Sequence, residues 1–191
     1  RRGGARREEL AAWARARADV VDVLDAHTDL PIQVQVDAPE KVGIDRLLNA
    51  VAANRKRQEN VAAIVIDAGS AVTVDYVDNT GAFRGGAILP GFALMGRALH
   101  DHTALLPIVP VPDDVAVPAK NTVAAIQAGI LHAVVGGIQR VIEHLHQSVP
   151  VAFEVFLTGG DAERIASRLH RPLHLWPEMT LEGILHSRKR E

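Results

Sequence analysis

The run from Val61 to Asp75 (VAAIVIDAGSAVTVD) constrains the fold more than any other part of the chain. It predicts an apolar strand that ends in Asp67, a turn at Gly69 and Ser70, and a second strand. Backbone N–H groups and hydroxyls in such a turn can face phosphate oxygens, and the carboxylate can hold a cation beside them. The alternative is an ordinary hairpin turn that contains an aspartate.

Composition indicates an ordinary globular protein. The 191 residues fit one domain or one and a half, and the formal net charge of −2 gives no reason to expect a nucleic-acid or anionic-membrane partner. The absence of cysteine excludes disulfides, thiolate metal sites and cysteine nucleophiles. The first residues lack the apolar core of a signal peptide, and no apolar run approaches the about 18–20 residues of a membrane span. We therefore expect a cytoplasmic protein without nucleic-acid or membrane partners.

The hydrophobic pattern predicts helices and strands along the whole chain. Helices are expected over 8–26, 42–55, 92–99, 122–146, 162–169 and 181–186. Strands are expected over 32–36, 61–67, 71–77, 83–89, 151–157 and 173–176. The four prolines between residues 106 and 120 predict an extended connector. Three meandering strands followed by alternating helices and strands predict an α/β fold, a mixed sheet with helices on its faces.

A second turn of similar chemistry, Thr158-Gly159-Gly160-Asp161, follows a later strand. Its glycines let a backbone approach a ligand closely, and the helix that follows offers its N-terminus. The alternative is a plain turn from strand to helix with Asp161 as a cap. Two such turns in one chain favour nucleotide binding.

The segment Gly43-Ile44-Asp45-Arg46 opens a predicted helix. Asp45 could accept a proton from a hydroxyl, and Arg46 could hold a carboxylate through two hydrogen bonds. The alternative is that Asp45 merely favours the positive end of its helix and that Arg46 is solvated. Taken without context, the residues favour this alternative.

Two further segments carry both a structural and a functional interpretation. The glycine-rich run from Gly85 to Gly91 indicates a backbone that passes close to a ligand or partner chain, or else a bulge. Asn121 and Thr122 are ordinary residues for a helix start, and Thr122 could also donate a hydrogen bond to a substrate placed there. Glycines inside the long helix indicate close packing against another backbone, at Gly129, Gly136 and Gly137.

Together and in this order, the motifs resemble the type III pantothenate kinase family. The matching segments lie at 39–50, 66–73, 85–91, 103–107, 121–122, 158–162 and 181–183. The resemblance therefore runs from about Pro39 to Gly183. Several ordered motifs at family-like spacing are far more specific than a single glycine-rich loop.

The resemblance implies an actin-like, ribonuclease-H-like kinase fold with ATP in the cleft between two domains. It implies phosphorylation of pantothenate to 4'-phosphopantothenate with ATP, Mg²⁺ and a monovalent cation, K⁺ or NH₄⁺, which is the first step of coenzyme A biosynthesis. It also implies a homodimer with pantothenate near the subunit interface. We expect residues 1–38 to be a remnant of the N-terminal domain and residues 39–191 to form the C-terminal domain.

By the same resemblance, Asp45 is the general base on the pantothenate hydroxyl and Asp67 holds the monovalent cation. The residues of the pantothenate site are Gly43, Ile44, Asp45, Arg46 and Thr122. The residues at ATP are Gly69, Ser70, Gly159 and Gly160, with Ser70 where the family usually has Thr. Phosphoryl transfer needs mainly positioning and charge neutralisation, with one carboxylate to orient the attacking hydroxyl, and these residues fit that need.

Two departures from the family pattern keep other functions open. The family begins with an Asp-x-Gly-Asn-Thr phosphate loop, and no such segment precedes Pro39. We expect either that the sequence lacks the first half of the domain or that this homologue has lost it. Val36 also stands where the family often has Tyr. The alternatives are a catalytically impaired homologue that acts as a dimeric binding or regulatory protein and, more distantly, another actin-fold sugar or acetate kinase.

Overall fold

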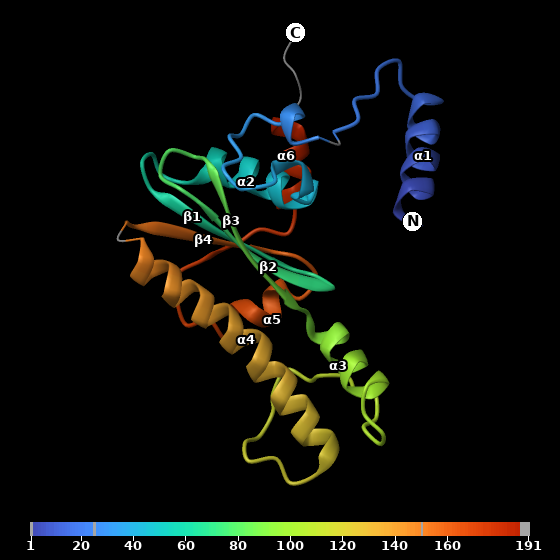
Figure 1. Cartoon of the computed structure of the whole chain (residues 1–191), viewed down its shortest axis with the longest axis vertical. Helices are drawn as coiled ribbons and strands as arrows, with labels where there is room; N and C mark the ends of the chain where they lie inside the picture. The colour runs from blue at the N-terminus through green and yellow to red at the C-terminus, as the bar shows by residue number, and fades with distance from the viewer. Residues whose placement is uncertain (1, 25, 150, 188–191) are drawn as a thin grey trace.

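The computed structural model describes residues 2–24, 26–149 and 151–187. Its centre is one mixed sheet with the strand order β3-β2-β1-β4-β5 (Figure 1). The strands are β1 (Ala62–Ala68), β2 (Ala71–Val77), β3 (Phe83–Pro90), β4 (Phe153–Thr158) and β5 (His174–Leu175). β1, β2 and β3 form an antiparallel meander, and β4 and β5 continue the sheet in parallel.

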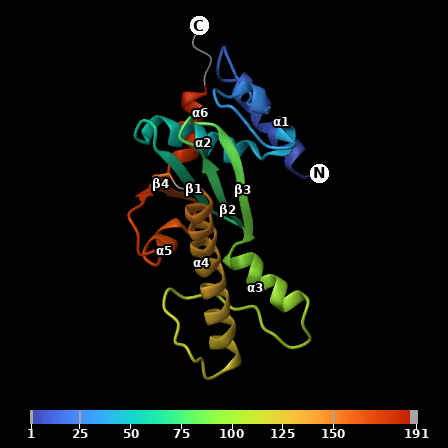
Figure 2. The same cartoon turned by 60° about the vertical axis from the view of Figure 1, so that its left-hand side comes forward.

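Helices cover both faces of the sheet. The α-helices are α1 (Arg2–Arg15), α2 (Ile44–Lys56), α3 (Phe92–Asp101), α4 (Thr122–Ser148), α5 (Ala162–Ala166) and α6 (Met179–His186), and 3-10 turns lie at His27–Asp29 and Pro39–Lys41. α2 and α6 lie on one face, and α4 and α5 lie on the other, as the two views agree (Figures 1 and 2). The predicted mixed sheet flanked by helices is therefore confirmed.

The central strand β1 is apolar without interruption because both of its faces are covered. Successive side chains of a strand point to opposite faces, so Ile64 and Ile66 pack in the core on the α4 side, whereas Ala63 and Val65 pack on the α2 side. None of these four side chains is more than 1% exposed.

The register of the sheet decides where the two predicted phosphate turns lie. Asp67 pairs with Thr73 on β2 and with Thr158 on the parallel strand β4. Parallel strands end at the same edge of a sheet. The turn after β1 and the turn after β4 therefore lie side by side.

The prediction of a helix over residues 8–26 is wrong in its second half, because α1 ends at Arg15. Its apolar spacing does not reflect packing: Leu10 is 65% exposed, Trp13 is 56% exposed and Val20 is 77% exposed. Helices are stabilised mainly by an apolar face that packs against the rest of the protein, and these three side chains do not belong to the described core. Leu24 does pack on the core, but it lies outside any helix.

The predicted strand over residues 32–36 is reduced to a single bridge between Val34 and Phe83. Two backbone hydrogen bonds flank it, from Gln35 N to Phe83 O (2.9 Å) and from Phe83 N to Gln33 O (2.8 Å). The alternation of apolar and polar residues over 32–36 instead reflects which side chains pack against the core, namely Ile32, Val34 and Val36. The other predicted helices and strands all occur, with ends shifted by a few residues at most.

α4 corrects two expectations. Within the described residues it is the one helix long and apolar enough, by length and composition, to cross a membrane, whereas the sequence predicted none. Its inward side chains nevertheless belong to the sheet core, at Ile126, Ile130, Val134, Ile138 and Ile142. Of its three glycines, only Gly137 has a close neighbour, because a Cβ at Gly129 or Gly136 would meet nothing within 4 Å.

The packing of α6 on α2 gives a stability prediction. A Cβ added at Gly183 would lie 2.1 Å from the backbone oxygen of Leu48. We expect Gly183→Ala to lower the free energy of unfolding by about 1–3 kcal/mol, since the two helices must move apart. Urea unfolding followed by circular dichroism measures this.

Gly129→Ala is the matched control because its Cβ enters open space. Alanine favours a helix over glycine by up to about 1 kcal/mol, so this variant should be as stable as the wild type or more stable. Equal unfolding midpoints for the two variants would contradict the close contact of α2 and α6.

Candidate active site

The segment Gly43-Ile44-Asp45-Arg46 lies at the start of α2, as predicted. Asp45 is exposed in the first turn, and its Oδ1 accepts a hydrogen bond from the backbone N–H of Arg46 (2.9 Å). A Cβ at Gly43 would lie 2.5 Å from the same Oδ1, so glycine leaves room for the carboxylate. The exposed Asp45 carboxylate is thus held in one position at the N-terminus of α2.

Arg46 is not solvated, so the structural alternative for this residue is wrong. Its Nε donates to both carboxylate oxygens of Asp75 at 3.1 Å, and its Nη2 also donates to Oδ1. The Asp75 side chain is 1% exposed and that of Arg46 is 15% exposed. The carboxylate that Arg46 binds belongs to Asp75, a partner that the sequence analysis missed, and its contact with a substrate carboxylate stays a prediction.

Burial raises the pKa of Asp75, and the hydrogen bonds and charge of Arg46 partly offset this effect. In return, hydrogen bonding to Asp75 raises the pKa of Arg46. The guanidinium is therefore charged throughout the range of pH in which the protein would work.

Asp67 ends β1 and is held by a chain of hydrogen bonds from two helices. Its Oδ2 accepts from Nδ2 of Asn49 on α2 (3.1 Å), and Oδ1 of Asn49 accepts from the hydroxyl of Thr180 on α6 (2.7 Å). Asn49 is fully buried, so both ends of its amide need a partner, and both have one. The ionised Asp67 carboxylate can only accept, so it takes the NH₂ end of the amide and leaves the oxygen to the Thr180 hydroxyl.

Burial raises the pKa of Asp67 as well, opposed by the hydrogen bond from Asn49. The charge of Asp45 further raises the pKa of both Asp67 and Asp75. Asp45 is thus near enough to repel each of the other two carboxylates, and negative charge gathered in this way favours a bound cation.

Asp67 fits a role as a cation ligand through one oxygen. Asn49 binds Oδ2, whereas Oδ1 lies toward the turn, 3.9 Å from the position of a Cβ at Gly69. Within the described ranges, no group of three or more His, Asp or Glu side chains could hold a metal ion. A cation bound by Asp67 would therefore need other oxygen ligands as well.

The two turns predicted to face ATP brace each other through backbone contacts. Gly159 has φ +98°, and a Cβ there would lie 2.5 Å from the backbone oxygen of Ala68, so only glycine fits. Asp161 N also donates to Ala68 O (3.0 Å). Ser70 and Gly160 remain exposed on this edge.

One predicted donor in the first turn is already used. Gly69 N–H donates to Ala71 O (3.0 Å). Gly91 N–H donates to the backbone oxygen of Ser70 (3.0 Å), and a Cβ at Gly91 would lie 2.4 Å from Gly69 O. Gly91, which directly follows β3, therefore packs against the backbone of this turn and helps to hold it in place.

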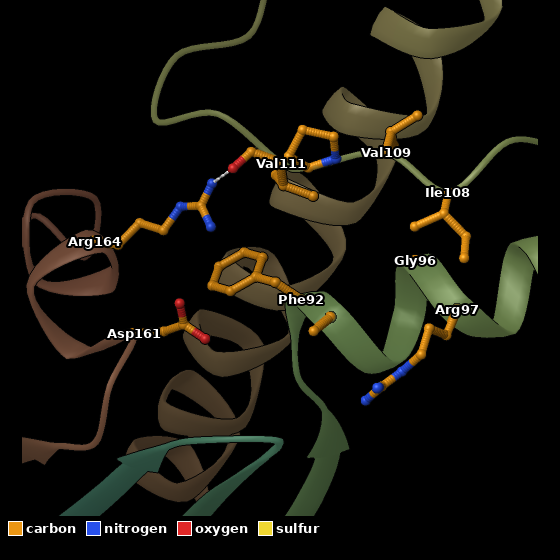
Figure 3. A pocket seen from close by; sticks show the side chains of 10 residues that line it. Phe92, Gly96, Arg97, Ile108, Val109, Val111, Asp161 and Arg164 are labelled. Atoms are coloured by element: carbon orange, nitrogen blue, oxygen red, sulfur yellow. Dashed lines mark hydrogen bonds between the residues drawn. The ribbon is translucent and has the colours of Figure 1, made fainter.

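A cavity of about 650 Å³ adjoins the second turn (Figure 3). Asp161 and Phe92 line it, together with Arg164, which donates to Pro112 O (2.7 Å) and pairs with Asp113 (3.1 Å). The Arg164 guanidinium also lies 4.4 Å from the centroid of the Phe92 ring. A cavity of this size can hold a ligand as large as a nucleoside.

Thr122 is the one predicted site residue that lies far from the others in the fold. Asn121 Oδ1 accepts from Ala124 N (2.9 Å), which confirms the helix cap. Thr122 itself is exposed, and the first turn of α4 lies at the end of the molecule away from α2 (Figures 1 and 2). A helix of 27 residues is about 40 Å long, so one chain does not bring Thr122 to Asp45.

Two of the three residues that the sequence analysis missed left a signal in the sequence. Asp75 is a charged residue within the apolar strand VTVDYV. Asn49 lies one helical turn beyond Asp45, among the apolar residues that α2 buries. Thr180 had no signal of its own, because its role depends on the packing of α6 against α2.

Solved structures share this fold. A Campylobacter jejuni protein described as a Baf family transcriptional activator is 23% identical and superposes with a TM-score of 0.58, over 84% of this chain and 68% of the other. The predicted fold class, an actin-like mixed sheet flanked by helices, is confirmed.

Sequence comparison shows the family. The family model for type III pantothenate kinase matches residues 4–144. Proteins named type III pantothenate kinase are 38% identical over 81% of the chain in Petrotoga mobilis, 38% over 86% in Geobacter sulfurreducens and 36% over 80% in Listeria monocytogenes. The chain spans 59%, 64% and 58% of these relatives, respectively. It belongs to the type III pantothenate kinase family.

Proposed function

We propose that the full-length protein that carries this sequence phosphorylates pantothenate with ATP, giving 4'-phosphopantothenate for coenzyme A biosynthesis. The observation that carries this proposal is the exposed Asp45 carboxylate, which is fixed by the backbone N–H of Arg46 and lies close enough to Asp67 to raise the pKa of that residue. Residues 1–38 and 39–191 would belong to its N-terminal and C-terminal domains. We place the enzyme in the cytoplasm, without nucleic-acid or membrane partners.

In the proposed reaction, Asp45 accepts the proton of the pantothenate hydroxyl as that oxygen attacks the γ-phosphorus of ATP. One P–O bond forms, the bond to the β-phosphate breaks, and ADP leaves. Arg46 binds the substrate carboxylate, while Gly43 and Ile44 leave the start of α2 accessible. The exposure of Asp45 supports this role because the substrate hydroxyl must reach it.

The edge formed by the two turns would hold the phosphates of ATP. The Ser70 hydroxyl replaces that of Thr, and Gly69, Gly159 and Gly160 let the phosphates approach the backbone. The cavity beside Asp161 is open to the rest of the nucleotide. Mg²⁺, bound through the phosphates, and a monovalent cation at Oδ1 of Asp67 would neutralise the phosphate charge.

A homodimer would complete the pantothenate site, with Thr122 supplied by the second copy. The distance between α2 and the start of α4 within one chain supports this arrangement. So do exposed apolar side chains around α3 and the start of α4, which are Leu94, Leu105, Ile108, Val117 and Val123. Large exposed apolar surfaces commonly mark interfaces.

Replacing Asp45 tests the base. We expect Asp45→Asn to lower kcat by about 10²–10⁴-fold, because the amide cannot accept the proton. The melting temperature should hardly change, since Asp45 is exposed. A coupled assay for ADP release measures turnover, and Glu40→Gln, an exposed acid just before α2, is the control. Near-normal turnover by Asp45→Asn would refute the assignment.

Subunit mixing tests the shared site. Asp45→Asn and Thr122→Val homodimers should each be weakly active, whereas mixed dimers contain one intact site. Random reassembly should therefore restore about a quarter of wild-type activity. If unmixed and mixed samples are equally inactive, Thr122 does not act across the interface.

Thermal unfolding tests the cation site. K⁺ should raise the melting temperature of the wild type relative to tetramethylammonium at equal ionic strength, because a ligand of the native state stabilises it. Asp67→Asn should abolish the response. The same response to K⁺ in both proteins would exclude Asp67 as the ligand.

Without K⁺, Asp67→Asn should be the more stable protein at pH 7. The folded state raises the pKa of Asp67 above its ordinary 3.8, so it disfavours the ionised form that the unfolded chain adopts. The difference should be greatest above the folded pKa and should disappear as the pH falls below 3.8. The opposite trend would show that Asp67 stabilises the fold when ionised.

A further inference from the structure

Asp75 is a buried acid that the proposed reaction does not use. It lies within β2 between buried neighbours, Val74 and Tyr76, and is 1% exposed. A carboxylate in such a place is unfavourable unless a charged partner satisfies it. Arg46 is that partner, and it reaches Asp75 from another element, α2.

The contact uses one edge of the Arg46 guanidinium. Asp75 binds Nε and Nη2, which form one side of the planar fork. The group carries five N–H donors in a fixed plane, so the opposite edge, Nη1 with the outer N–H of Nη2, points away from Asp75. Part of the side chain is still exposed, at 15%. A second carboxylate can therefore be bound by the edge that remains.

The neighbouring strand is shaped around this pair. Gly86 lies opposite Asp75 in the register, and a Cβ there would come 2.6 Å from the Asp75 carboxylate. The register shifts between Asp75 and Val77, which confirms the bulge predicted as one alternative for the glycine-rich run. The ring of Phe83 lies 5.6 Å from Cζ of Arg46 and limits its movement.

We propose that Asp75 is the positioning residue that aims Arg46, and that it thereby makes the site selective for substrates with a carboxylate. This inference rests on the proposed function. Asp75 holds the long side chain in one orientation before the substrate arrives, so binding does not have to order it. Asp75 acts only through Arg46 and touches no reacting atom.

The test compares two ligands in the full-length protein. Pantothenate carries the carboxylate, and its alcohol analogue, pantothenol, lacks it. We expect Asp75→Asn to raise the Kd and the KM for pantothenate by about ten-fold or more, with a smaller change in kcat and none in the KM for ATP. Pantothenol binding, measured by calorimetry, should be unchanged.

A double-mutant cycle keeps the test valid if Asp75→Asn folds poorly. Arg46→Gln together with Asp75→Asn removes both charges and leaves no unpaired buried ion. Adding Asp75→Asn to Arg46→Gln should cause no further loss of pantothenate affinity, because the two residues act as one unit. Additive losses would overturn the inference.

The remaining outcomes separate this inference from the proposed function. Asp78→Asn, which breaks a 3.8 Å contact with Arg84 outside the site, should leave both affinities unchanged. If Asp75→Asn weakens pantothenate and pantothenol equally, the residue is only structural and the inference fails. If the variant matches the wild type, the inference alone fails. If the wild type binds no pantothenate, both fail.

Discussion

Two carboxylates on the sheet hold helix α2 in position. The position of α2 in turn decides where the other residues of the candidate site lie. Asp75 binds Arg46, and Asp67 binds Asn49 three residues further along the same helix. Residues three apart share one helix face, so α2 can meet both acids at once. Asp45, at the helix start, is thereby fixed close to the edge where the turns of β1 and β4 meet.

The same contacts concentrate negative charge in one place. Arg46 compensates for Asp75, whereas Asp67 and Asp45 have no such partner among their described contacts. Burial and mutual repulsion raise the pKa of Asp67. Ionised carboxylates held near each other are unfavourable for folding and useful for binding cations and protons. The raised pKa of Asp67 means that its ionised form lowers the stability of the folded state, a trade-off that active sites commonly show.

Much of the fold could be predicted from local pattern. The apolar run of β1, the turn at Gly69 and the cap at Asn121 each follow from short-range chemistry. The contacts of Asp75 and Thr180 could not be predicted, because each depends on side chains that are distant in the sequence. Val20 shows the converse error: its spacing predicts a helix to residue 26, but α1 ends at Arg15 and Val20 is exposed. Thr122 was predicted as a site residue, yet a single chain leaves it far from α2.

The proposed activity, phosphoryl transfer to pantothenate, depends on these contacts. Its most direct test is the formation of 4'-phosphopantothenate by the full-length protein, with ATP, Mg²⁺ and K⁺, followed by mass spectrometry of the product. We expect product at millimolar pantothenate, in an amount equal to that of the ADP released. ADP release without phosphopantothenate, or no turnover at all, would contradict it.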